Sequence, residues 1–449
     1  MYGSVEQTPM NSAPAVYSPC CPIVEGVQRR LDVPAYILAG GVGSRLGAIT
    51  AGRPKPLVPF AGHHRVIDFT LSNCANSGIT DATLLTQHMP EAIERYVGDG
   101  SAWGFAGPDA RMRVMRPDNG GEYLGTADAV WQRLPDSIEE SPRAVLVLAA
   151  DHVYRMDYAA MVQHHLDSGA DLTLGVITVP IEDAHRFGVL ACADGGRVER
   201  FDEKPEHPAS NLVSMGIYVF EPERLRQLLA MDAASDGSHD FGHDVLPLAL
   251  QLGLRVQAYE FRGYWRDIGT AESYWAAHRD LLLGDTDPGI AATLQASCSR
   301  MRGARRLVFG DDAVARVSSI FGGCVIEGMV ERSVLAPGVH IGRGAIVRDS
   351  VLLAGARVEA GAIVDHAVLD ERSVVGRAAS VGSARGMQAV RDESGQRAIT
   401  VVGAGARVAN ASVITRGSVV TIEESAPVAA PASPARLHKA PVLPERTHA

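Results

Sequence analysis

The sequence lacks the features of secreted, membrane-bound and nucleic-acid-binding chains. Its longest unbroken apolar run, Ala144 to Ala150, is far too short to span a bilayer, and its N-terminus has no basic-then-apolar signal pattern. Lysine and arginine total 42 against 52 acidic residues, and the formal charge of -10 disfavours general binding to nucleic acid or to an acidic membrane. We therefore expect a cytoplasmic protein with no nucleic-acid or membrane partner, in which an anionic ligand meets a local positive cluster.

Cysteine is also scarce, and its placement argues against a cysteine metal site. Cys20 and Cys21 are adjacent rather than separated by two residues, and the other four cysteines are scattered. Cysteines that remain reduced thiols fit this pattern.

The overall composition is that of an ordinary globular protein, since apolar residues make up 46% of the chain and charged residues 21%. Because 449 residues exceed one compact core, we expect two folded domains plus tails.

Composition and periodicity divide the chain into five segments. Residues 1–32 are rich in proline, serine and small residues, which predicts a mobile N-terminal arm, and the Ala/Pro-rich residues 421–449 predict a disordered tail. Between them we expect a catalytic domain over 33–285, a linker over 286–315 and a repeat domain over 316–420.

The expected catalytic domain alternates short apolar runs with helix-like stretches. Apolar runs without strict alternation are typical of strands that are covered on both faces. The pattern predicts an α/β fold with a Rossmann-like, mostly parallel sheet flanked by helices. The expected strands are Ala35–Leu38, Ala82–Leu85, Ala144–Leu148 and Leu172–Val176.

The second expected domain has a 17-residue repeat. Gly338 to Val347 reads GVHIGRGAIV, and seventeen positions later Gly355 to Val364 reads GARVEAGAIV. Gly405 to Val408 repeats Gly-Ala-Arg-Val. This spacing predicts coils of roughly three hexapeptide repeats stacked in a left-handed parallel β-helix, rather than an ordinary Val/Gly-rich β-domain. Residues 376–400 are irregular, so we expect an interruption there.

A glycine-rich loop follows the first expected strand. Gly40, Gly41 and Gly43 let backbone N–H groups approach an anion closely, and Arg45 follows them. The loop matches neither the Walker pattern nor the dinucleotide fingerprint, and a tight turn is the alternative interpretation. Further on, two prolines hold Lys55 on a stiff segment. The two basic side chains would together neutralise a triphosphate.

These residues give the chain a resemblance to the sugar-1-phosphate nucleotidyltransferases. The family signature Gly-Gly-x-Gly-x-Arg-Leu, then Lys-Pro, is matched by Gly40 to Leu46 and by Lys55-Pro56. Further segments are similar to the ADP-glucose pyrophosphorylase branch and cover most of residues 33–285. They are Arg65–Gly78, Tyr123–Val130, Ser214–Phe220, His239–Gly242 and Tyr264–Thr270.

The resemblance implies glucose-1-phosphate adenylyltransferase activity, which forms ADP-glucose and pyrophosphate from ATP and glucose 1-phosphate, for glycogen or another α-glucan. The sugar phosphate attacks the α-phosphorus in line with the departing pyrophosphate. Because a phosphate monoester is already anionic, the reaction needs no general base and no covalent intermediate. Catalysis then comes from alignment and from charge neutralisation by Mg²⁺, Arg45, Lys55 and the loop amides.

Asp151 follows a buried apolar run, at the strand end where open α/β sheets bind ligands. A helix N-cap is the alternative, because residues 154–165 have a helical pattern. Mg²⁺ prefers one or two carboxylates together with phosphate oxygens. The resemblance implies that Asp151, with Arg45 and Lys55, is catalytic, and that Asp151 and Asp267 hold Mg²⁺.

Lys204, beside a proline, is a positioned point charge, although Glu-Lys-Pro is also common on solvated surfaces. By resemblance, Lys204 binds the phosphate of glucose 1-phosphate and Glu203 hydrogen-bonds the sugar. The resemblance also implies that Gln87 lies by the adenine. The remaining residues of the sugar pocket are Tyr123, Gly188 and Ser214.

The resemblance also implies a homotetramer with β-helix contacts, and a small-molecule effector bound between the two domains. Arg53 and Arg65 match basic residues of such an effector site, whereas Gly52 and Pro59 replace a lysine and a histidine. Activation by fructose 1,6-bisphosphate is therefore not expected. Linker arginines either rebuild the effector site or form a solvated basic segment. They are Arg300, Arg302, Arg305 and Arg306.

Three rival interpretations stay open. The same chemistry can use UTP, dTTP or glucosamine 1-phosphate. A non-catalytic regulatory subunit would keep the fold and lose the charged residues, which are all present in this chain. An acyltransferase on a β-helix would need a histidine, for which His340 and His366 are the candidates.

Overall fold

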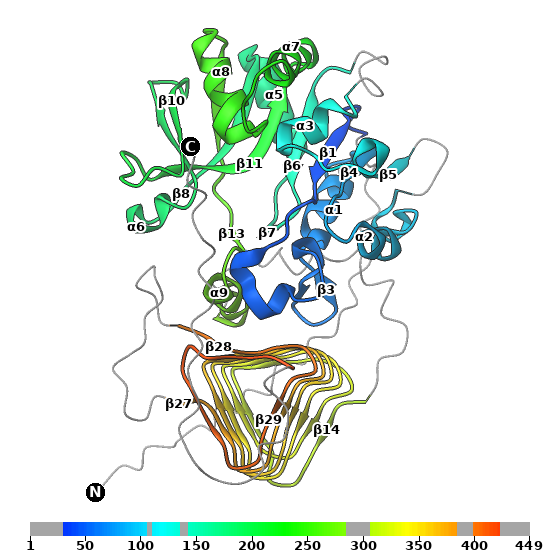
Figure 1. The fold of residues 1–449 in the computed structure, drawn as a ribbon, viewed down its shortest axis with the longest axis vertical. Coiled ribbons are helices and arrows are strands. Elements are labelled where there is room, and N and C mark those ends of the chain that lie inside the picture. Colours follow the sequence, from blue (N-terminus) through cyan, green and yellow to red (C-terminus); the bar gives the residue numbers. More distant parts are fainter. Residues whose placement is uncertain (1–29, 106–109, 135–141, 284–305, 384–397, 423–449) are drawn as a thin grey trace, which may run out of the picture.

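The computed structural model describes residues 30–105, 110–134, 142–283, 306–383 and 398–422. An α/β domain stands on one face of a β-helix (Figure 1). The predicted arm, linker and tail fall mostly outside these ranges, as do three of the four linker arginines. Among the described helices, none is long and apolar enough to cross a membrane.

The α/β domain is built on a nine-stranded sheet within the described residues, in the order β10-β9-β11-β6-β1-β4-β5, with β8 between β11 and β12. All four predicted apolar runs are strands of this sheet, and the α/β fold is confirmed. The bounds are β1 Ala35–Leu38, β4 Asp81–Leu85, β5 Arg111–Met115, β6 Val145–Ala149, β8 Leu172–Thr178, β9 Gly188–Cys192, β10 Val198–Glu203, β11 Leu212–Phe220 and β12 Val256–Glu260.

The sheet is mixed rather than uniformly parallel. Strands β4, β1 and β6 run parallel side by side, whereas β11 is antiparallel to β6, β8 and β9. Helices cover both faces, which explains the continuous apolar runs. The helices are α1 Ile67–Asn76, α2 Pro90–Val97, α3 Thr126–Trp131, α5 Tyr158–Ser168, α6 Ile181–Ala184, α7 Pro222–Ala233, α8 Leu246–Gln251 and α9 Ala271–Leu283.

The segment after Asp151 differs from the helical alternative. Residues His152–Tyr154 form strand β7, which pairs antiparallel with β13, Trp265–Asp267. Helix α5 begins only at Tyr158, and its N-cap is Asp157, whose side chain accepts from the Ala159 amide. The N-cap interpretation of Asp151 is therefore wrong.

The predicted left-handed β-helix is confirmed as three six-stranded parallel sheets. The 17-residue repeat sets the register, because Val347 pairs with Val364 in the next coil. The expected interruption lies between β27 and β28, and the stacking resumes after it, since β28 pairs with β25. Residues 384–397 within it lie outside the described part.

The strands of the β-helix are short and follow one another around each coil. One sheet contains β14 Val308–Phe309, β17 Val325–Ile326, β20 His340–Ile341, β23 Arg357–Val358, β26 Val374–Val375 and β29 Arg407–Val408. The next contains β15 Val314–Arg316, β18 Met329–Glu331, β21 Ile346–Arg348, β24 Ile363–Asp365, β27 Ser380–Ser383 and β30 Val413–Thr415. The third contains β16 Ser319–Ile320, β19 Val334–Leu335, β22 Val351–Leu352, β25 Ala367–Leu369, β28 Thr400–Val402 and β31 Val419–Val420.

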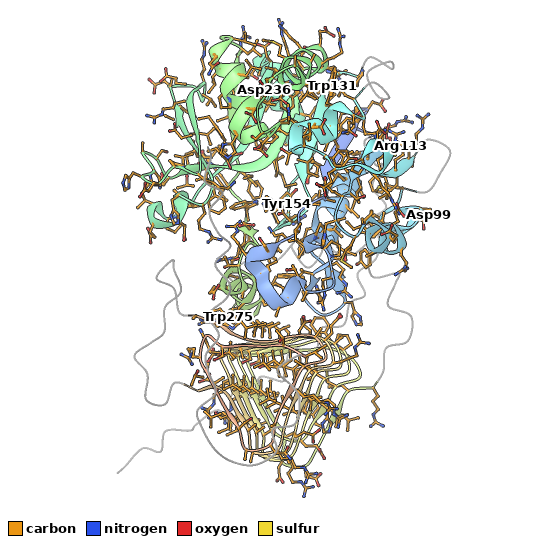
Figure 2. The ribbon with its side chains drawn as sticks, viewed as in Figure 1. Asp99, Arg113, Trp131, Tyr154, Asp236 and Trp275 are labelled. Carbon is orange, nitrogen blue, oxygen red and sulfur yellow. The ribbon has the colours of Figure 1, made fainter. Side chains whose placement is uncertain are left out.

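The third sheet faces the α/β domain, and its outward side chains are buried there. Val351, Val368 and Val401 share one apolar cluster with Tyr274 of α9. Trp275, labelled at this junction in Figure 2, donates its indole N–H to the Asp349 carbonyl at 2.7 Å. The two domains therefore share a continuous core. His366, a candidate for acyl transfer, packs against Trp275 with ring centroids 4.3 Å apart and the ring planes tilted by 59°.

Candidate active site

The site begins where three neighbouring parallel strands end. The glycine loop follows β1, Gln87 follows β4 and Asp151 follows β6. Gln87 lies between the predicted nucleotide and sugar subsites. Its Oε1 accepts a hydrogen bond from the Tyr123 amide at 2.9 Å. On the nucleotide side, a Cβ added at Gly40 would lie 3.5 Å from the Gln87 Cβ. These strand ends are where open α/β sheets bind ligands.

The loop packs tightly against the segment that carries Lys55. Gly43 has φ of 73°, and a Cβ there would lie 2.9 Å from the Lys55 Cβ, so both conformation and space require glycine. Its carbonyl accepts from the Thr50 hydroxyl at 3.0 Å, which ties the loop to the end of η1 (Ser44–Thr50). Gly41 and Arg45 are exposed on the open side.

Lys55 bridges the two predicted metal carboxylates. Its Nζ lies 2.6 Å from Asp151 Oδ2 and 3.2 Å from Asp267 Oδ1, and its side chain is 8% exposed. Burial opposes charge on both Lys55 and Asp151, but their mutual attraction outweighs it. The pKa of Lys55 is therefore raised, and the pKa of Asp151 lies well below its usual range. Both groups are charged at neutral pH.

The pairing of β7 with β13 builds the acidic end of this cluster. It places Asp267 opposite His152, and ligand atoms of Asp151, His152 and Asp267 all lie within 4.8 Å of one another. Two carboxylates beside a phosphate site fit a hard cation such as Mg²⁺, whereas imidazole suits softer metals. The donor set thus fits Mg²⁺ through the two aspartates.

Two of the predicted sugar-side residues, Lys204 and Gly188, lie against the Glu203 carboxylate. Its Oε1 accepts from Lys204 Nζ at 2.6 Å. Cβ atoms added at Gly188 and Gly242 would lie 2.9 and 2.4 Å from Oε2, so two glycines keep space open beside this oxygen. Lys204 has φ of 44°, and its amide donates to the Phe187 carbonyl at 3.1 Å. In the sequence, Gly242 was indicated only as part of His239–Gly242, one of the segments that resemble the family.

Ser214 lies on β11, where pairing with β8 is irregular. Its hydroxyl accepts from the Gly216 amide at 3.2 Å and its residue is 9% exposed. Gly216 in turn approaches the end of β6, with a would-be Cβ 3.6 Å from the His152 ring. The bulged part of β11 thus connects the predicted sugar side to the carboxylates.

Two further residues lie at the cluster. Arg186 was missed in the sequence, and Gly269 was indicated only as part of the resemblance segment Tyr264–Thr270. Arg186 Nη2 lies 3.6 Å from Asp267 Oδ2, and its guanidinium sits over the Phe187 ring, 5.6 Å from the centroid. A Cβ at Gly269 would lie 2.6 Å from Asp267 Oδ2 and 3.2 Å from Arg45 Nη2. Arg186 has no local pattern in the sequence that distinguishes it from a surface arginine.

The two predicted effector residues lie at the domain junction, away from this cluster. Arg53 Nη1 is 3.1 Å from Asp370 Oδ1, and Arg65 Nη2 is 3.3 Å from Glu371 Oε1. Both arginines are therefore paired with carboxylates of the β-helix. They line a cleft of about 800 Å³. Its other lining residues include Gly52, Leu57, Arg95, Tyr96, Glu371 and Arg372.

Comparison with known proteins agrees with both domains. Residues 34–283, more than half of the chain, match the family described as nucleotidyl transferase, and residues 306–402 match the GlmU-like, C-terminal hexapeptide family. Glucose-1-phosphate adenylyltransferase from Bacillus mycoides (strain KBAB4) is 42% identical over 347 residues, which are 76% of this chain and 91% of that protein. The protein of the same name from Desulfitobacterium hafniense (strain Y51) is 38% identical over 394 residues, 87% of this chain and 98% of its own length. The chain therefore belongs to the nucleotidyl transferase family, as a sugar-1-phosphate nucleotidyltransferase.

Proposed function

We propose that the protein is a glucose-1-phosphate adenylyltransferase, which converts ATP and glucose 1-phosphate into ADP-glucose and pyrophosphate for α-glucan synthesis. The observation that carries this proposal is the 42% and 38% identity to two proteins of that name, over nearly their whole length. The cluster of Lys55, Asp151 and Asp267 supports it, because a regulatory subunit without catalysis has no need of these buried charges.

On the nucleotide side, the glycine loop and Gln87 bind ATP in this proposal. Gly40, Gly41 and Gly43 leave the loop amides accessible to phosphate oxygens, and the exposed Arg45 adds a charge. Lys55 donates to two carboxylates, which leaves one of its three N–H groups for a phosphate oxygen.

Asp151 and Asp267 are the proposed Mg²⁺ ligands. When bound, Mg²⁺ neutralises phosphate charge and orients the leaving pyrophosphate. Lys55 holds the two carboxylates at a fixed separation before substrate arrives, since it bonds to both of them. Such preorganisation lowers the reorganisation required in the transition state.

On the sugar side, Glu203 accepts hydrogen bonds from sugar hydroxyls, and Lys204 binds the phosphate that attacks the α-phosphorus. Tyr123, Gly188 and Ser214 complete the pocket in this proposal. The nucleophile is an anionic phosphate oxygen, so the residues need to align it rather than deprotonate it.

The test is pyrophosphate release from glucose 1-phosphate with ATP, UTP, dTTP or GTP, with and without Mg²⁺. We expect a strong, Mg²⁺-dependent preference for ATP that is lost in Asp151→Ala. The matched control is Asp157→Ala, which removes a carboxylate six positions away that caps α5 and costs about 1 kcal/mol of stability. Preference for UTP or dTTP would refute the adenylyl assignment, and no release with any nucleotide would favour a regulatory subunit.

Two further features are proposed from the relatives and the junction. A small anionic effector would bind the cleft at Arg53 and Arg65, where it competes with Glu371 for both guanidinium groups. Measurement of the activity with increasing concentrations of phosphate-bearing metabolites tests this site.

A homotetramer is the proposed assembly, and the sedimentation coefficient of the full chain tests it.

A further inference from the structure

We propose that Arg186 binds the phosphate of the sugar 1-phosphate as a second cation beside Lys204. This proposal rests on the proposed function, because it assigns a residue to the sugar-phosphate subsite of that reaction. Arg186 lies in the turn between α6 and β9, which no motif of the sequence marked.

The first observation is a buried donor without an acceptor. The Arg186 side chain is 15% exposed, and its Nη2 makes no hydrogen bond within the described residues. The nearest carboxylate oxygen of the cluster, Asp267 Oδ2, is 3.6 Å away, beyond hydrogen-bond distance. A buried charged donor of this kind is costly unless a ligand or water supplies the acceptor.

The second observation is the position of Arg186 between the carboxylates and the sugar pocket. The following residue, Phe187, accepts from the Lys204 amide, and the next, Gly188, lies against Glu203. On the other side, Arg186 reaches Asp267, the carboxylate that Lys55 approaches from the nucleotide side. A phosphate bound between Asp267 and Lys204 therefore lies within reach of Arg186.

The third observation is that the guanidinium rests on one aromatic ring, which is itself packed against others. It sits over Phe187, whose ring packs against Trp265 at 5.4 Å, and Trp265 packs against His152 at 5.1 Å. The Arg186 amide also donates to the Asp183 carbonyl at 3.2 Å, which fixes the backbone of the turn. A preorganised arginine binds an oxyanion with little loss of side-chain freedom.

Charge balance explains why this arginine becomes available in the working enzyme. Asp151 and Asp267 carry two negative charges, and Lys55 and Arg186 approach them with two positive charges. The partly exposed Asp183 adds a third carboxylate, with its Oδ1 at 4.0 Å from Arg186 Nη1. A divalent cation held by Asp151 and Asp267 would neutralise these carboxylates and would leave Lys55 and Arg186 to attract phosphate. Lys55, packed against Gly43, faces the nucleotide, and Arg186, beside Phe187 and Gly188, faces the sugar phosphate.

The test compares Arg186→Gln and Arg186→Lys with the parent protein. Arg200→Gln is the matched control, since Arg200 lies on neighbouring β10 with its side chain 65% exposed. Calorimetric titration with glucose 1-phosphate and Mg²⁺, and steady-state kinetics, measure the affinity. A charge-assisted hydrogen bond corresponds to roughly 10-fold to 100-fold in affinity. We expect a rise of that size in Kd and KM for glucose 1-phosphate in Arg186→Gln, with partial recovery in Arg186→Lys. The KM for ATP should change less than about twofold.

A different result would overturn the proposal. If Arg186→Gln changes the Mg²⁺ concentration for half-maximal activity but not the affinity for glucose 1-phosphate, Arg186 only neutralises Asp267. If the parent protein forms no ADP-glucose, the proposed function fails separately, and titration with inorganic phosphate then decides whether Arg186 binds a phosphate group. Should Arg186→Gln fail to fold, Arg186→Met keeps the aliphatic contacts without the charge, and an unchanged affinity for glucose 1-phosphate in that variant refutes the proposal.

Discussion

Removal of Arg53 should destabilise the junction between the domains. The Asp370 side chain is fully buried, its Oδ1 lies 3.1 Å from Arg53 Nη1, and its Oδ2 has no hydrogen bond in the described residues. At this distance and an effective dielectric constant of about 20, the attraction amounts to about 5 kcal/mol. Arg53→Gln leaves a buried carboxylate without its cation, so we expect a loss of about 3–5 kcal/mol in the free energy of unfolding.

The loss of stability in Arg53→Gln should depend on pH, because Asp370 is titratable. Burial raises the pKa of Asp370 even with Arg53 present, and loss of the cation raises it further. A carboxyl group whose pKa is higher in the folded than in the unfolded state favours folding when protonated, and this contribution is lost as pH rises. The deficit of Arg53→Gln should therefore be largest near pH 8 and shrink towards pH 5.

Urea unfolding followed by tryptophan fluorescence is the assay, since Trp275 lies at the junction. The double variant Arg53→Gln/Asp370→Asn should recover most of the loss, because it removes both charges. Arg343→Gln, an exposed site on the β-helix, is the control and should change stability by less than about 0.5 kcal/mol. A deficit below about 1 kcal/mol, or one that is the same at pH 5 and pH 8, would refute the reasoning.

Three further predictions concern the site and the junction. Asp267→Asn should lower the rate of pyrophosphate release at least about 100-fold through loss of a Mg²⁺ ligand, and a drop of tenfold or less would contradict the assignment. Gly188→Ala adds a Cβ that would lie 2.3 Å from the Phe201 ring and 2.9 Å from Glu203 Oε2, so both side chains must shift and KM for glucose 1-phosphate should rise while KM for ATP stays constant. Equal changes in both KM values would count against the pocket. His278 is buried and neutral, with its Nε2 accepting from the Ala61 amide, and burial lowers its pKa to about 4. Because this pKa lies below that of the unfolded chain, its stabilising contribution is complete above about pH 6.5 and falls by about 3 kcal/mol towards pH 4. Thermal unfolding between pH 7 and pH 5 should show a shallower slope in His278→Gln, and an unchanged slope would exclude His278 as the source.

Local patterns in the sequence predicted the elements that depend on local rules. The run before Asp151 is apolar because helices cover both faces of β6, and the 17-residue period predicts the register that pairs Val347 with Val364. The direction in which a strand runs produces no local sequence pattern, so the antiparallel orientation of β11 was not predicted. The helical pattern of 154–165 was misleading at its start, because Tyr154 pairs with Trp265 in a strand.

Contacts between distant segments were beyond reach of the sequence alone. Residue types and the family resemblance indicated Asp151 and Asp267. That Lys55 bonds to both carboxylates depends on the pairing of β7 with β13. Arg186 reaches Asp267 only because the turn before β9 folds over that pair. The partners of the predicted effector arginines lie more than 300 positions away, in a coil of the β-helix.

Two members of the catalytic cluster, Lys55 and Asp267, are each close in sequence to a residue that bonds to the β-helix. Lys55 comes two residues after Arg53, which is paired with Asp370 of the β-helix. Asp267 comes four residues before α9, and Trp275 of that helix donates to the Asp349 carbonyl of another coil. Both partners of the Lys55–Asp267 ion pair, whose atoms are 3.2 Å apart, are therefore close in sequence to residues that bond to the β-helix. The domain junction and the carboxylate cluster are thus built on the same two segments of the chain, Arg53 to Lys55 and Asp267 to Trp275.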